Sequence, residues 1–74
     1  MKKILIITFD IPVNRSALRT RIWRKLRKIG AKNRFRSHWI LPFSEGNLAD
    51  FKVLRDEIIK SDGKAEVIRG VVVE

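Results

Sequence analysis

The chain has 74 residues, no cysteine and a single histidine, which excludes disulfides, thiolate metal sites and histidine-rich metal sites. Its formal net charge of +9 arises from 17 lysines and arginines against 8 acidic residues, and a charge of this size bears on solubility and partners rather than on fold. The core of a domain this small seldom supplies more than about 3–5 kcal/mol. We therefore expect one domain over residues 1–74 that gains stability by forming a homodimer.

The first element that the sequence predicts is a strand over Lys3–Phe9. It is rich in β-branched residues and almost continuously apolar, which is typical of a central strand covered on both faces. Asp10 follows directly, and Pro12 restricts the loop over residues 10–14. The strand therefore delivers a single carboxylate to its C-terminal end.

From Ser16 the apolar period changes to that of an amphipathic helix. The predicted buried stripe consists of Leu18, Ile22, Leu26 and Ile29. Ser16 or Asn14 would cap the start of this helix, and Gly30 stands where a left-handed C-terminal cap is favoured. The opposite side is basic and carries Arg21, Arg24, Arg27 and Lys28, with Lys25 at the flank and Trp23 at the edge of the apolar stripe.

The segment over residues 31–42 alternates between faces and ends at Pro42, which suits the end of a strand. It forms either one long bent strand or two strands with a very tight turn near Arg36 and Ser37. Trp39 is expected in the core, but Trp39 and Trp23 are also candidates for stacking on nucleobases.

A second helix is predicted over residues 47–61, with Asn47 as its cap. Its buried stripe consists of Leu48, Phe51, Leu54 and Ile58. Asp62 and Gly63 form a turn signal, and a closing strand follows over Lys64–Val73. This order of elements predicts an α+β fold, a ferredoxin-like β-α-β-β-α-β sandwich with two helices on one face of an antiparallel sheet.

The closing strand ends in a β-branched run that would expose an unpaired, aggregation-prone sheet edge. Gly70, just before this run, marks a bend or a bulge. We expect Val71, Val72 and Val73 to pair with the partner chain of the homodimer by strand addition.

The charge is segregated along the chain. No acidic residue occurs between Ile11 and Ser44, whereas ten basic residues do. A polyanion is therefore the favoured partner, and we expect the protein to contact its phosphates independently of base sequence. The alternative is that these charges are merely solvated. The residues expected to bind nucleic acid are Arg15, Arg19, Arg21, Arg24, Lys25, Arg27, Lys28, Arg34 and Arg36.

Three stretches together resemble a known family, namely TFDIP, RSALRTRIWRKLRKIGA and RSHWILP. They resemble the Cas two family of small CRISPR adaptation proteins, and equally the related domain of phenylacetate-repressor-type and chromate-resistance-type regulators. The aspartate after the first strand marks the former, whereas the arginine-tryptophan helix ending in Gly-Ala is more typical of the latter. The resemblance spans roughly Lys3 to Val67. The chain departs from the Cas two pattern in being short and in carrying Leu41 and Pro42 where an acidic residue is frequent.

The resemblance implies a homodimer that handles nucleic acid in CRISPR antiviral defence, where it bridges two copies of the Cas one integrase and a DNA duplex during spacer acquisition. It further implies that Asp10 faces its own copy in the partner chain and that the pair holds one Mg²⁺ for phosphodiester cleavage. Asp10 is thus the candidate catalytic residue and the candidate metal ligand. The alternative is that its carboxylate accepts backbone N–H groups in its own turn or pairs with Arg15 or Arg19.

Three hypotheses follow for the function. The leading one is an architectural DNA-binding subunit of the integration complex, and the second is a magnesium-dependent endonuclease, which the same protein could also be. The third is a dimerisation and DNA-binding domain of a transcriptional regulator, which we expect less because 74 residues leave no room for the regulators' further domains. The sequence leaves open whether DNA or RNA is preferred and whether the chain is an enzyme.

The start of the chain superficially resembles a signal peptide. Its apolar run is too short, however, and Asp10 and Pro12 interrupt it. No stretch approaches the roughly 20 apolar residues that a membrane span needs. Together with the lack of cysteine, this favours a soluble cytoplasmic protein without a membrane partner.

Overall fold

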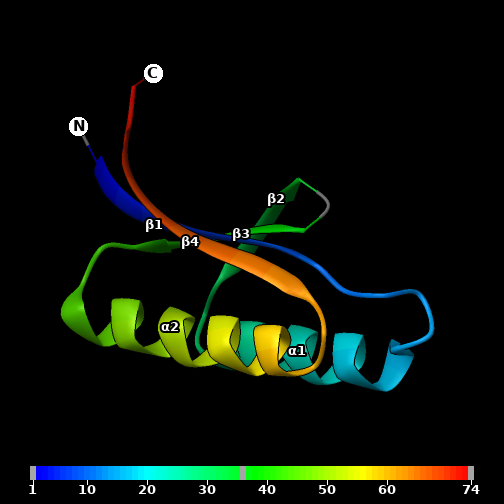
Figure 1. The fold of residues 1–74 in the computed structure, drawn as a ribbon. Helices are drawn as coiled ribbons and strands as arrows, with labels where there is room; N and C mark the ends of the chain where they lie inside the picture. The colour runs from blue at the N-terminus through cyan, green and yellow to red at the C-terminus, as the bar shows by residue number, and fades with distance from the viewer. Residues whose placement is uncertain (1, 36, 74) are drawn as a thin grey trace.

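The computed structural model describes residues 2–35 and 37–73 and has the predicted order of elements. The elements are β1 (Lys2–Asp10), α1 (Ser16–Lys28), β2 (Lys32–Phe35), β3 (His38–Pro42), α2 (Glu45–Lys60) and β4 (Lys64–Val72). The strands form an antiparallel sheet in the order β2-β3-β1-β4, and both helices lie on one face of it (Figure 1). The predicted ferredoxin-like α+β arrangement is confirmed. Within the described residues, no helix has the length and apolar composition needed to cross a membrane.

The sheet has one covered face and one open face. β1 lies between β3 and β4, as its apolar run predicts. Its side chains at Leu5, Ile7 and Phe9 are buried against the helices, whereas Ile4 and Ile6 on the other face are only partly buried. The expectation that both faces are covered is therefore wrong for the single chain, because both helices occupy the same side.

Helix α1 begins at the predicted residue but is capped differently. Arg15 occupies the N-cap position and its side chain makes no capping hydrogen bond, so neither Ser16 nor Asn14 has the predicted role. At the other end, Gly30 has a φ of 85°, and the amide of Ala31 donates to the Leu26 carbonyl at 2.9 Å. This geometry is that of a Schellman motif and confirms the predicted glycine cap.

The segment after α1 forms two strands rather than one. β2 and β3 pair with a β-bulge, since Asn33 lies opposite Trp39 and Phe35 lies opposite His38. Trp39 is 6% exposed and belongs to the core, as expected. Arg36 lies outside the described residues.

Helix α2 starts two residues earlier than predicted. Its cap is Ser44, whose hydroxyl accepts a hydrogen bond from the Asn47 amide at 3.0 Å, so the assignment of Asn47 as the cap is wrong. The side chain of Asn47 instead donates to the Pro42 carbonyl at 2.8 Å. Two residues therefore connect the end of β3 at Pro42 to the start of α2 at Glu45.

The turn between α2 and β4 passes close to the end of β1. Asp62 adopts a φ of 67°, and the amide of Gly63 donates to the Ile58 carbonyl at 2.9 Å. A Cβ atom at Gly63 would lie 2.6 Å from the Ile58 Cγ2 atom and 3.0 Å from the Asp10 carbonyl oxygen. Only glycine allows this approach, which packs the turn directly against Asp10.

Strand β4 pairs with β1 in regular register from Lys64 to Val72. The pairing continues through Gly70 opposite Ile4, so the predicted bulge at this glycine is absent. Val71 and Val72 belong to this ladder, and Val73 follows it with 81% of its surface exposed. Because β4 is the last strand in the sheet order, its outer edge has no partner strand within the described residues.

Candidate nucleic-acid interface

Two of the predicted nucleic-acid-binding residues hold the helices together. Arg21 and Lys25 on α1 both bind Glu57 on α2, with Nε–Oε2 and Nζ–Oε1 distances of 2.7 Å each. The hydrogen bond from Lys25 chiefly lowers the pKa of Glu57; the Arg21 hydrogen bond and both positive charges act in the same direction, while partial burial opposes them. Helix α1 contains no acid of its own. Part of its charge is therefore offset by Glu57 on the neighbouring helix, through contacts that sequence analysis did not identify.

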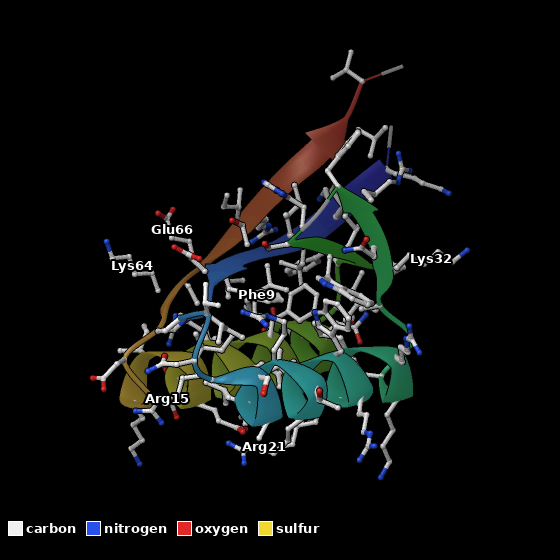
Figure 2. The ribbon with its side chains drawn as sticks, turned by 90° about the vertical axis from the view of Figure 1, so that its right-hand side faces the viewer. Phe9, Arg15, Arg21, Lys32, Lys64 and Glu66 are labelled. Carbon is white, nitrogen blue, oxygen red and sulfur yellow. The ribbon has the colours of Figure 1, made fainter. Side chains whose placement is uncertain are left out.

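Arg19 contacts the loop that follows β1, and Arg15 contacts the turn between α2 and β4. The Arg19 Nη2 atom donates to the carbonyl oxygen of Ile11 at 3.3 Å and to that of Pro12 at 3.5 Å. Arg15 pairs with Asp62 at 3.3 Å, and this ion pair is largely exposed. Both cations therefore already have partners in the folded chain. Figure 2 shows Arg15 and Arg21 on the helix layer, below the sheet.

The remaining predicted cations of α1 are exposed and unpaired. Arg24, Arg27 and Lys28 have no hydrogen-bond or ion-pair partner in the part of the chain that the structure describes. Spacings of three and four residues place them on one side of the helix. Positive charge in the last turn also favours the helix dipole, but this effect does not require three cations on one face.

Strand β2 also carries exposed cations without partners among the described residues. Lys32 and Arg34 are exposed and lack a hydrogen-bond or ion-pair partner among the described residues. Lys32 projects away from the sheet at its β2 edge (Figure 2). We call Arg24, Arg27, Lys28, Lys32 and Arg34 the free basic set. Among the described residues of the basic segment, this set, rather than the full predicted list, can meet phosphate without breaking a contact within the chain.

Asp10 lies at the exposed end of β1, opposite Lys64 in the ladder with β4. Its carboxylate has no hydrogen-bond or ion-pair partner within the described residues. Neither alternative from the sequence is therefore realised, since Arg15 and Arg19 bind elsewhere and no described backbone amide donates to this side chain. The rigid strand holds an unpaired carboxylate in an accessible position.

Asp10, Lys64 and Glu66 are among the residues that line a shallow hollow of about 220 Å³. The Lys64 and Glu66 side chains lie near each other on β4 in Figure 2. Glu66 pairs in register with Thr8, which makes it a diagonal neighbour of Asp10 on the open face. Glu66 could not be found from the sequence, because its position depends on the register of two strands that lie far apart in the chain.

The donor set of one chain fits a magnesium ion only in part. Asp10 and Glu66 offer carboxylate oxygens, which magnesium prefers, but the residue paired with Asp10 in the ladder is the cationic Lys64. Within residues 2–35 and 37–73, no three His, Cys, Asp or Glu side chains gather as a metal-binding group. A second copy of the chain would bring a second Asp10 carboxylate, as the family resemblance implies.

We compared the chain with protein-family models, curated proteins and solved structures, and none of them matches. The function is therefore inferred from the fold, the charge distribution and the motifs described above.

Proposed function

We propose that this protein binds nucleic acid as a homodimer and acts as an architectural subunit of a CRISPR spacer-acquisition complex, where it bridges Cas one integrase subunits and double-stranded DNA. The observation that carries the binding function is the free basic set, five exposed cations without partners in the described chain. The resemblance of the TFDIP, helix and RSHWILP stretches supplies the biological setting.

The chemistry of this surface favours contacts to the phosphate backbone. Lysine and arginine on a helix face meet phosphates one by one, and such contacts position a protein without reading base sequence. We therefore expect similar affinity for duplexes of different sequence. RNA duplexes are a second outcome of the same assay, because phosphate contacts alone do not exclude them.

Self-association is supported by two features of the sheet. Its open face carries the partly exposed isoleucines Ile4, Ile6, Ile40 and Ile68, and the outer edge of β4 is unpaired among the described strands. A chain of 74 residues has a small core, and covering more apolar surface with a second copy would add stability. Strand addition at Val71–Val73 is the pairing that we propose.

The binding function is tested by removing charge from the free basic set. The variant Arg24→Gln/Arg27→Gln/Lys28→Gln should bind a blunt DNA duplex more weakly at every base sequence, as measured by fluorescence anisotropy. A matched control, Lys52→Gln/Arg55→Gln/Lys60→Gln, removes the same number of charges from α2. Equal weakening by both variants would show that net charge alone, and not this surface, provides the affinity.

A second candidate function is magnesium-dependent cleavage at paired Asp10 residues. The observation that favours it is the unpaired, accessible carboxylate at the end of a rigid strand. When bound, the ion would polarise a phosphodiester oxygen, while the chain itself would position the phosphate through its cations. Asp10→Asn separates the two roles, since spacer acquisition should survive if the protein is architectural and cleavage should vanish if Asp10 is catalytic.

The regulator hypothesis remains as the alternative. A dimerisation and DNA-binding domain of a transcriptional regulator would use the same phosphate contacts. The position of the gene distinguishes them, because a CRISPR array beside it supports the adaptation function and its absence supports the regulator.

A further inference from the structure

Phe35 is the one phenylalanine of the four that the fold does not use in packing. Phe9 and Phe51 are buried in the core. Phe43 packs against the core, and the guanidinium carbon of Arg69 lies 4.1 Å from the centre of its ring. The Phe35 residue, by contrast, is 70% exposed at the end of β2. Exposing a ring to this extent forgoes most of the free energy that its burial would provide.

The backbone around Phe35 is held in place by side chains of the hairpin. The Asn33 Nδ2 atom donates to the His38 carbonyl at 3.3 Å. His38 Nδ1 lies 3.1 Å from the Phe35 carbonyl oxygen, which accepts the hydrogen bond from the Nδ1–H tautomer. The β-bulge makes Arg34 the additional residue opposite His38, and bulges of this kind redirect side chains. The hairpin therefore presents the ring from a defined position.

The surroundings of the ring are cationic. Lys32 and Arg34, both members of the free basic set, precede Phe35 on the same strand and are exposed. β2 is an edge strand of the sheet, and Figure 1 shows the β2–β3 hairpin above the helix layer. A planar apolar ring beside unpaired cations matches a nucleotide chemically, because the cations meet phosphate and the ring meets a base.

We propose that Phe35 is a stacking platform for an unpaired nucleobase, and that the hairpin binds a single strand, including one that extends from the end of a duplex. The inference deepens the proposed nucleic-acid binding and rests on it. Bases within an intact duplex already stack on one another, so only an unpaired base offers a free face to the ring. Aromatic rings next to a positively charged path are the means by which single strands are bound without base specificity.

The test compares two DNA probes with variants at Phe35. One probe is a blunt duplex, and the other is the same duplex with a single-stranded extension that contains 2-aminopurine. Phe35→Ala should weaken binding of the extended probe about 5- to 150-fold, the range expected for loss of one base–aromatic stack, while blunt-duplex affinity changes less than twofold. Phe35→Leu should lose as much, because leucine keeps apolar surface but cannot stack, whereas Phe35→Trp should retain binding.

The 2-aminopurine fluorescence gives a readout that a general loss of affinity cannot imitate. At saturating protein concentration, stacking on the wild-type Phe35 ring should quench the 2-aminopurine fluorescence. The Phe35→Leu variant should leave this fluorescence unquenched. Val53→Ala is the matched control, because Val53 is an apolar side chain on α2 with 64% exposure and lies outside the free basic set. It should change neither affinity nor quenching.

Other results would overturn the proposal. Retained affinity and quenching in Phe35→Leu would show that stacking is not involved. Equal weakening of both probes, or a shift from dimer to monomer in sedimentation of Phe35→Ala, would place Phe35 in a protein contact instead. Failure of the wild-type protein to bind the blunt duplex would count against the proposed function, whereas the comparison of Phe35 variants on the extended probe tests the stacking platform separately.

Discussion

Gly63 allows the turn between α2 and β4 to pass against the end of β1, and Gly63→Ala tests this contact. The new methyl group would lie 2.6 Å from the Ile58 Cγ2 atom, 3.0 Å from the Asp10 carbonyl oxygen and 3.1 Å from the Ile58 carbonyl oxygen. Ile58 is fully buried, so its side chain has little room to move. Two of the three neighbours are backbone atoms, and relieving the contact would require the turn and β1 to separate.

The expected loss of stability in the Gly63→Ala variant is the difference between two opposing effects. Overpacking at a site of this kind costs about 1–3 kcal/mol. Replacing glycine by alanine where no left-handed φ is required recovers about 0.4–1 kcal/mol through the unfolded chain. We therefore expect a net destabilisation of about 1–2 kcal/mol, which corresponds to a fall in Tm of about 4–16 °C for a domain of this size.

Urea denaturation followed by circular dichroism measures this effect, with Gly70→Ala as the matched control. A Cβ atom at Gly70 meets nothing within 4 Å and its φ is not left-handed, so this variant should be as stable as the wild type or slightly more stable. Equal stability of the Gly63→Ala and Gly70→Ala variants would refute the close approach of the turn to β1.

Three further predictions concern Glu57, Arg15 and Asp10. The pKa of Glu57 is lowered in the folded state, so its contribution to stability is present above pH 4.5 and is lost as the pH falls through the lowered pKa. Glu57→Gln should therefore flatten the decline of the urea midpoint on acidification. An unchanged pH profile would contradict a stabilising ion pair between Glu57 and Lys25. Arg15→Ser should raise the free energy of unfolding by about 1 kcal/mol in thermal denaturation, because serine supplies the N-cap hydrogen bond that Arg15 does not make. The exposed ion pair that is lost with Asp62 contributes little. A lower stability of the variant would show that the ion pair matters more than the cap. Asp10→Ala should abolish any magnesium-stimulated cleavage while leaving sedimentation and duplex affinity nearly unchanged, and a loss of the dimer would indicate a structural role instead.

The sequence predicts those parts of the fold that depend on local patterns. The spacing of Leu18, Ile22 and Leu26 determines which side of α1 is buried. Gly30 ends that helix because a left-handed residue is needed there. The order of strands and helices leaves few ways of covering one sheet, so the ferredoxin-like arrangement follows from the order itself.

Features that depend on packing between distant segments could not be predicted. Glu57 meets Arg21 and Lys25 only because α1 and α2 lie side by side on the sheet. Lys64 reaches a position opposite Asp10 through the register of β1 with β4. The charge pattern indicated a basic segment, but only the folded chain distinguishes the cations that pair within the chain from those without a partner among the described residues.

The central claim is that Arg24, Arg27 and Lys28 bind phosphate directly. It is tested most directly by the dependence of duplex affinity on salt concentration, because each phosphate contact releases counterions. We predict that the plot of log K against log salt concentration becomes shallower by about 3 when all three residues are replaced by glutamine, whereas the Lys52/Arg55/Lys60 control keeps the wild-type slope. An unchanged slope in the α1 variant would contradict the account and show that these charges are only solvated.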